Sequence, residues 1–204
     1  MQQLLTGKTR LKGFREPWME KKLGDVAVFS TDSISVNMID KTWYIGTDNM
    51  LSNKCGIVKN MSAVSYSRVR QYKKDDILIS NIRPYLKKIW LADRVGGCSS
   101  DVLVIRVADD SECIPAFLKM QLSADAFFDY AMANTIGTKM PRGDKKALVN
   151  YSITLPSLSE QRAIASILTS MDDEIAALEQ KREKYVSLKQ GMMQELLTGR
   201  IRLV

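Results

Sequence analysis

The sequence has no histidine in any of its 204 residues. Histidine is the commonest general acid or base in enzymes, and both the Ser-His-Asp triad and the Cys-His pair require it. These classes of catalytic site are therefore excluded, whereas carboxylate and lysine chemistry stays open. The same absence argues against a zinc site, because histidine is one of the usual zinc ligands.

Cysteines and long apolar runs are scarce as well. Cys55, Cys98 and Cys113 are an odd number and form no Cys-x-x-Cys pair, so we expect free thiols rather than a disulfide framework. No run of about 18 apolar residues is present. Residues 1–14 also lack the apolar stretch of a secretion signal. We therefore expect a cytoplasmic protein with no metal site and no membrane partner.

Basic residues, by contrast, are concentrated in one stretch. The net charge is +7, and residues 54–94 alone hold ten Lys or Arg against three Asp or Glu. A local excess of positive charge is typical of a surface that binds a polyanion such as nucleic acid. A basic surface that is merely solvated would give the same totals, so charge alone does not decide between the two.

The chain changes character near Pro156. Before it, residues 76–80, 101–107 and 151–155 are apolar or alternating runs of strand length. Residues 115–122 and 124–133 have helical spacing, and the glycines at 96, 97 and 137 indicate turns. The expected core residues of the two helices are Phe117, Leu118, Leu122, Phe127 and Phe128. We predict an α+β domain with a mixed sheet.

After Pro156 the pattern predicts one long amphipathic helix over residues 158–197. Ser157 or Ser159 with Glu160 offers a capping box at its start. About 39 residues at 1.5 Å each give a coiled-coil spacer of roughly 58 Å. Apolar residues recur in steps of three, four and seven, which leaves a seam for a second helix. The seam residues we assign to a partner helix are Ile164, Leu168, Met171, Ile175, Leu178, Tyr185 and Met192.

A repeat joins the two ends of the sequence. Residues 1–11 (MQQLLTGKTRL) match residues 193–203 (MQELLTGRIRL) at eight of eleven positions. Chance is a poor explanation for this similarity. We expect the chain to be one unit of a tandem arrangement, ending in the segment with which the next unit would begin.

At this point the sequence resembles a known family. Residues 155–165 (LPSLSEQRAIA), followed by a long helix that ends in residues 191–200 (GMMQELLTGR), are similar to the central conserved region of type I restriction–modification specificity (S) subunits. Residues 18–25, 76–88, 98–105 and 137–142 resemble recurring segments of that family's target-recognition domain. Members usually contain two recognition domains and two helical regions, so this chain resembles a half-length form.

The resemblance implies four parts. Residues 1–14 would be the end of a preceding helix, 15–155 a DNA-binding target-recognition domain, 156–197 the spacer and dimerisation helix, and 198–204 a tail that repeats the N-terminal segment. The chain would read one half of a bipartite double-stranded DNA site, dock methyltransferase (M) subunits and a restriction (R) subunit, and form a homodimer through the helix. It would be non-catalytic and hold no cofactor, with S-adenosylmethionine, ATP and Mg²⁺ bound by the subunits that methylate adenine and cleave DNA.

The candidate DNA-contacting residues lie mainly in the basic stretch. Lysine and arginine contact phosphates, whereas side chains on base edges select the sequence. Aromatic residues interleave with the basic ones, and a second basic loop starts at Gly137. The predicted residues are Arg68, Arg70, Lys73, Lys74, Asn81, Arg83, Tyr85, Lys87, Lys88, Lys139, Arg142 and Lys145.

Two other functions are alternatives to DNA recognition: a nuclease and a non-specific adaptor. Asp173 with Glu179 and Lys181 superficially resembles a nuclease metal site, but six to eight residues along one helix cannot converge on a single Mg²⁺. The sequence also has no Gly-x-x-x-x-Gly-Lys-Ser/Thr loop for a nucleotide. The main alternative is a coiled-coil adaptor whose basic domain binds RNA or acidic protein without reading sequence.

Overall fold

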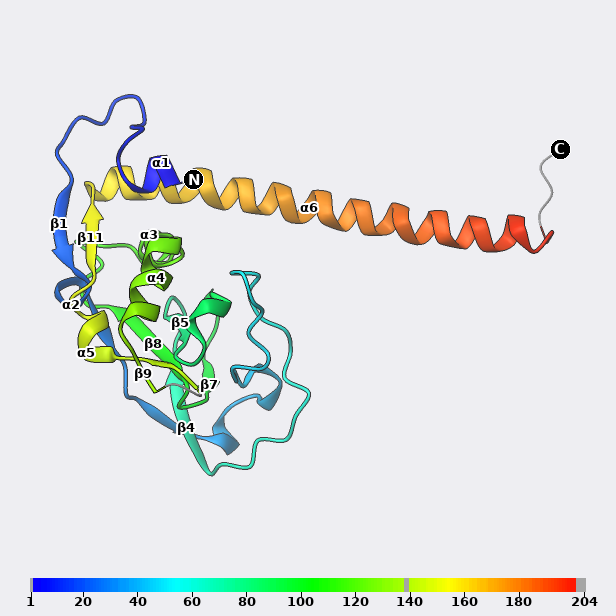
Figure 1. Cartoon of the computed structure of the whole chain (residues 1–204), viewed down its shortest axis with the longest axis horizontal. Coiled ribbons are helices and arrows are strands. Elements are labelled where there is room, and N and C mark those ends of the chain that lie inside the picture. The colour runs from blue at the N-terminus through cyan, green and yellow to red at the C-terminus, as the bar shows by residue number, and fades with distance from the viewer. Residues whose placement is uncertain (1, 138–139, 201–204) are drawn as a thin grey trace. The chain divides into compact units, whose positions relative to one another are not determined.

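The computed structural model describes residues 2–137 and 140–200. The chain divides into two units, Met1–Ala165 (unit 1) and Ser166–Val204 (unit 2). Unit 1 contains all the strands, and unit 2 contains most of one long helix (Figure 1). The predicted α+β class with a long C-terminal helix is confirmed.

Unit 1 is built on a four-stranded sheet in the order β2-β8-β5-β6. The predicted apolar runs become its two central strands, β5 (Ile77–Ser80) and β8 (Val102–Val107), which pair antiparallel with Ser80 opposite Val102. The edge strands are β2 (Ala27–Phe29) and β6 (Ile89–Leu91). All four residues of β5 are buried, as expected for a strand whose side chains are covered on both faces.

A second sheet has the order β3-β4-β7 and consists of β3 (Ser33–Ser35), β4 (Arg68–Tyr72) and β7 (Gly96–Cys98). The interpretation of Gly96 and Gly97 as a turn is wrong, because both lie in β7. A Cβ atom on Gly97 would come within 2.5 Å of Val69, and one on Gly96 would collide with the Tyr72 ring. The two glycines therefore serve close packing of one strand against its neighbour.

The named strand pairs are antiparallel, and a parallel bridge joins Ile45 to Cys98. Two short pairs complete the strands: β1 (Met19–Lys22) with β11 (Ser152–Leu155), and β9 (Thr135–Ile136) with β10 (Arg142–Gly143). The remaining short elements are α1 (Gln2–Leu5), α2 (Leu23–Val26), α5 (Lys145–Leu148), and the 3-10 helices η1 (Val36–Met38), η2 (Lys41–Trp43) and η3 (Pro84–Leu86).

Two helices, α3 (Pro115–Leu122) and α4 (Asp125–Ala133), agree with the predicted ranges to within one residue. All five residues predicted for their core are at most 1% exposed. The sheets share a further apolar cluster around Tyr72, whose hydroxyl donates to the carbonyl of Trp43 at 2.7 Å. Unit 1 therefore has a packed interior that fixes the loops at the ends of its strands.

The long helix α6 (Leu158–Leu197) has the predicted bounds. The predicted capping box is wrong, because the Glu160 carboxylate is bound by Arg10 and Trp18 instead. Of the predicted seam, Ile164 and Leu168 are buried. The other seam residues are more than half exposed: Met171, Ile175, Leu178, Tyr185 and Met192. Among the described residues, no helix is long and apolar enough to cross a membrane.

Candidate nucleic-acid interface

The end of β5 brings together three segments that are distant in sequence. The backbone N–H of Asn81 donates to the carbonyl of Asp101 at 2.8 Å, and Gly143 N–H donates to the carbonyl of Asn81 at 3.0 Å. An antiparallel bridge joins Ile82 to Arg142. The two loops selected from the sequence, around residues 81–83 and 141–143, are therefore neighbours. We call this region the loop end of β5.

Two arginines of β4 also reach toward the loop end. The Arg70 guanidinium donates to the carbonyl of Val102 at 2.6 Å, directly opposite Ser80 in the sheet. Arg68 is exposed and donates to the carbonyl and hydroxyl oxygens of Ser33 at 3.1 and 2.8 Å. Both arginines line an open cavity of about 310 Å³, together with Thr31, Asp32, Ser33, Tyr44, Tyr66, Val69, Cys98, Ser99 and Ser100.

The loop end carries further exposed basic and aromatic side chains. Arg142 forms an ion pair with Asp101 at 2.9 Å, and its side chain is 55% exposed. Arg83 is exposed and has a left-handed backbone (φ 50°), and Tyr85 in η3 is also exposed. Lys145 begins α5, where burial lowers the pKa of its ammonium group and the charge of Arg70 lowers it further. Positive charge from the loop after β5, from β10, from α5 and from β4 is thus found in this region.

The Asn81 side chain is not positioned to contact a base in this conformation. Its Oδ1 atom is buried and is the one buried side-chain nitrogen or oxygen without a hydrogen-bond partner among the described residues. A Cβ atom on Gly143 would lie 3.1 Å from that oxygen, so the glycine leaves room for it. A two-point contact with an adenine edge uses both atoms of an asparagine amide. Asn81 must therefore rotate outward before it can make such a contact.

Two predicted residues, Lys73 and Lys74, lie away from the loop end, and two that follow η3 next to it, Lys87 and Lys88, have side chains bound within unit 1. Lys73 and Lys74 occupy the turn before β5, at the opposite end of that strand, and Lys73 lies 3.9 Å from Asp32. Lys87 pairs with Asp125 at 2.8 Å, and Lys88 donates to the carbonyl of Thr47 at 2.7 Å. Lys139 lies outside the described residues.

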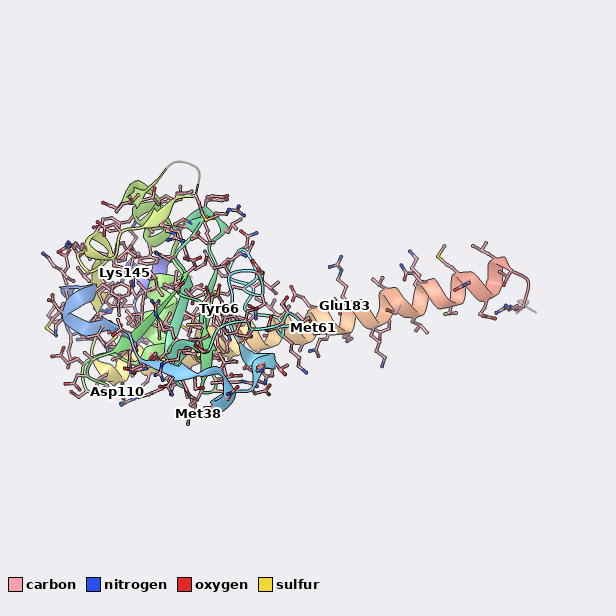
Figure 2. All side chains as sticks on the ribbon, turned by 90° about the horizontal axis from the view of Figure 1, so that it is seen from below. Met38, Met61, Tyr66, Asp110, Lys145 and Glu183 are labelled. Atoms are coloured by element: carbon pink, nitrogen blue, oxygen red, sulfur yellow. The ribbon has the colours of Figure 1, made fainter. Side chains whose placement is uncertain are left out.

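The structure adds residues that the sequence did not single out. Tyr44, Ser99 and Ser100 join Arg68 and Arg70 around the cavity. No motif marks Tyr44, and Ser99 and Ser100 were marked only as part of residues 98–105, which resemble a family segment. Tyr66 was visible only as an aromatic residue within the basic stretch, and it is 66% exposed in the structure. Figure 2 labels Tyr66 and Lys145 among the side chains of unit 1. Sequence proximity to Arg68 was the available signal for Tyr66, whereas the others are brought in by strand pairing.

Neither metal nor thiol chemistry finds support at this site. The described residues contain no group of three acids or cysteines placed to hold a metal ion. Cys98 and Cys113 are buried, and burial raises the pKa of each thiol to about 12. A thiol with such a pKa is a poor nucleophile near neutral pH. The arrangement supplies hydrogen-bond donors and positive charge for a polyanion.

Comparison with known proteins decides the family. A family model described as type I restriction modification DNA specificity domain matches residues 15–187. The chain belongs to this family. This confirms the prediction of a DNA specificity component rather than a catalytic subunit.

Two relatives carry matching names. The type I restriction enzyme MjaVIII specificity subunit of Methanocaldococcus jannaschii is 39% identical over 69 residues, which cover 34% of this chain and 16% of the relative. The type I restriction enzyme EcoDI specificity subunit of Escherichia coli is 31% identical over 98 residues, which cover 48% of this chain and 21% of the relative.

Solved structures share the fold. The HsdS subunit from Thermoanaerobacter tengcongensis superposes with a TM-score of 0.63 at 22% identity, covering 90% of this chain and 50% of that one. The S subunit of a type I system from M. genitalium gives a TM-score of 0.61 at 16% identity, covering 92% and 47%. The chain therefore spans about half the length of the specificity subunits whose fold it shares.

Proposed function

We propose that this specificity-family chain reads one half of a bipartite double-stranded DNA site through the loop end of β5. The observation that carries the proposal is that Arg70, Arg83 and Arg142 lie at one end of β5, while Arg68 and Arg70 line an open cavity. Arginine is the residue that most often contacts guanine edges and also binds phosphates in two-point geometry.

The long helix supports the second part of the proposal. Five seam residues between Met171 and Met192 are more than half exposed. Exposed apolar surface of this extent is costly in water, and pairing with a second helix would cover it. We propose that two copies pair through α6 in a half-length homodimer. Each copy would then present one recognition surface, and the target would be two inverted half-sites with a fixed spacing.

The remaining partners follow from the same proposal. The chain would dock methyltransferase subunits, and a restriction subunit would complete the complex. S-adenosylmethionine, ATP and Mg²⁺ would be bound by those subunits, which would carry out methyl transfer to adenine and cleavage. A non-specific basic adaptor is less well supported, because family membership gives a reason for sequence reading that charge alone lacks.

The test is a selection of bound duplexes from a random DNA pool, using the purified chain with its cognate methyltransferase subunit at moderate salt. The expected result is enrichment of two inverted copies of one short sequence at a fixed spacing. Strong binding that enriches no sequence and falls steeply with salt would overturn the proposal in favour of the non-specific adaptor. Enrichment of one uninterrupted sequence would refute the paired half-site arrangement.

A further inference from the structure

Residues 2–11 occupy a specific site within unit 1. Leu5 is 4% exposed, and its carbonyl accepts a hydrogen bond from Gln121 at 2.8 Å. Gly7 lies against the Trp18 ring, which a Cβ atom would approach to 3.3 Å. The Arg10 guanidinium donates to both carboxylate oxygens of Glu160, each at 2.8 Å. We call this the segment site.

The centre of the segment site is a buried acid. Glu160 is fully buried, and its carboxylate also accepts a hydrogen bond from Trp18 Nε1 at 3.2 Å. A buried carboxylate is strongly unfavourable without a partner of opposite charge. The site therefore requires an arginine at the position of Arg10, whichever segment supplies it.

Residues 193–203 repeat the features that the site contacts. Leu5, Gly7 and Arg10 correspond to Leu197, Gly199 and Arg202 at the constant offset of the repeat. The positions that differ include Lys8 and Thr9, which are both exposed. The three residues whose contacts define the site, Leu5, Gly7 and Arg10, are thus all repeated.

The two segments also share a backbone conformation. Each has a leucine at the end of a helix, followed by a threonine and then a glycine with positive φ, which is 68° at Gly7 and 70° at Gly199. Gly199 N–H and Arg200 N–H donate to the carbonyls of Leu196 and Glu195, which is a Schellman motif. The burial differs sharply, because Leu197 is 80% exposed whereas Leu5 is buried. Residues 197–199 thus share the backbone shape of residues 5–7 but not their burial.

We propose that the segment site also accepts residues 193–203 of a second copy of this chain, with Arg202 taking the place of Arg10 beside Glu160. Glu160 lies in the first turn of α6, and the second segment begins within its last turn. Antiparallel pairing of two α6 helices brings these two ends together, so two copies exchange segments reciprocally. This inference goes beyond DNA reading, and its tests contain no DNA.

The first experiment asks whether the second segment fits the site within one chain. The triple variant Gln3→Glu, Lys8→Arg, Thr9→Ile makes residues 1–11 identical to residues 193–203. We expect its melting temperature to stay within about 2 °C of the unaltered chain, because Leu5, Gly7 and Arg10 are unchanged. Arg10→Ala should lower it by at least about 5 °C, because it leaves a buried carboxylate short of its partner. A triple variant as destabilised as Arg10→Ala overturns the proposal.

The second experiment tests exchange between molecules. The host is the full chain with Arg10→Ala and Arg202→Ala, so that neither of its own segments supplies the arginine. The probe is a fluorescent peptide of residues 193–204, and the control peptide carries Arg202→Ala. Fluorescence anisotropy should show at least tenfold tighter binding of the probe than of the control peptide, and a similar loss when the host also carries Glu160→Gln.

The outcomes are distinguishable from a failure to read DNA. Equal binding of the two peptides overturns the exchange, whatever the duplex selection gives. A host with Lys8→Ala in place of Arg10→Ala keeps its own segment seated, so it should bind the probe at least tenfold more weakly. If the Arg10→Ala host does not fold, the melting temperature of the triple variant still decides whether the repeated sequence fits the site.

Discussion

The two ends of strand β5 are built in contrasting ways. At the turn before the strand, Asp76 is buried, and the Arg106 guanidinium donates to both of its carboxylate oxygens at 2.7 Å. The backbone N–H of Lys73 donates to the same carboxylate at 2.7 Å. The third guanidinium nitrogen of Arg106, Nη1, donates to the Asp32 carboxylate at 2.9 Å. The buried charge at the turn end is thus matched by partners in unit 1.

The loop end has the opposite character. Asn81 Oδ1 is buried with no hydrogen-bond partner among the described residues, and the Arg83 side chain is exposed. Arg142 has a partner in Asp101, but its side chain is more than half exposed. Unsatisfied or strained groups are destabilising, and they recur where a protein meets a ligand. The contrast indicates that one end of β5 stabilises the fold while the other is shaped for a partner.

The largest expected effect comes from breaking the turn end. Arg106→Ala leaves the buried Asp76 carboxylate without its two-point partner. We expect a loss of about 3 kcal/mol in the free energy of unfolding, as is usual when one member of a buried ion pair is removed. Urea denaturation monitored by circular dichroism measures it.

Asp32→Asn is the matched control for that change, because Asp32 binds the same guanidinium from an exposed position. An exposed partner contributes little, so we expect a much smaller loss for Asp32→Asn than for Arg106→Ala. Equal losses for Arg106→Ala and Asp32→Asn would show that burial of Asp76 does not govern stability at the turn end, and the contrast between the two ends would fail.

The next largest effect is on DNA binding at the loop end. Arg142→Ala removes one exposed arginine and leaves Asp101 as an uncompensated negative charge beside the proposed DNA surface. We expect affinity for the selected duplex to fall by about 1–3 kcal/mol. The free energy of unfolding should change by less than about 1 kcal/mol. Titration of labelled duplex at fixed salt checks the first value, and urea denaturation checks the second.

Lys74→Ala provides the comparison from the turn end, since both residues are exposed and basic. We expect it to weaken binding less than Arg142→Ala, by at most the loss of one phosphate contact, which also lowers the salt dependence slightly. If Lys74→Ala costs as much affinity as Arg142→Ala, the DNA surface extends along the whole of β5 and is not confined to the loop end.

Much of the fold was predictable because local patterns coincide with the tertiary structure. Apolar runs of strand length predict β5 and β8 without any knowledge of their neighbours. Helical spacing of apolar residues does the same for α3, α4 and α6. Gly96 and Gly97 were misread because a glycine pair indicates a turn by composition, whereas here the cause is the bulk of Tyr72 and Val69 on the adjacent strand. Glu160 was misread for a similar reason, because its partner Arg10 is 150 residues away.

The candidate site was predictable only in part. Charge density selected residues 54–94, and together with the second basic loop it supplied Arg68, Arg70, Arg83 and Arg142 as candidates without ordering them in space. It did not distinguish these from Lys87, which is bound to an acid of α4. Long-range pairing decides whether a lysine is bound inside the molecule or left for a partner, and a single sequence carries no record of that pairing.

The smallest expected effect concerns Lys87 and its acid partner. Lys54 and Lys87 both donate to Asp125 at 2.8 Å, and these hydrogen bonds lower the pKa of its carboxyl group from 3.8 to about 2. Asp125 therefore stabilises the fold fully above pH 4 and loses that contribution as the pH falls toward 2. The difference in unfolding free energy between the unaltered chain and Asp125→Asn should shrink over this range.

Asp129→Asn is the control for the pH series, because Asp129 is an exposed carboxylate on the same helix. Urea denaturation at several pH values between 2 and 5 gives the difference in unfolding free energy between the unaltered chain and each variant. This difference should change more with pH for Asp125→Asn than for Asp129→Asn. Lys87→Ala should then reduce the pH dependence due to Asp125 while changing duplex affinity less than Arg142→Ala does. A Lys87→Ala variant with unchanged pH dependence and a large loss of affinity would instead place Lys87 with the loop-end arginines, because its ammonium group would then be acting on DNA and not on Asp125.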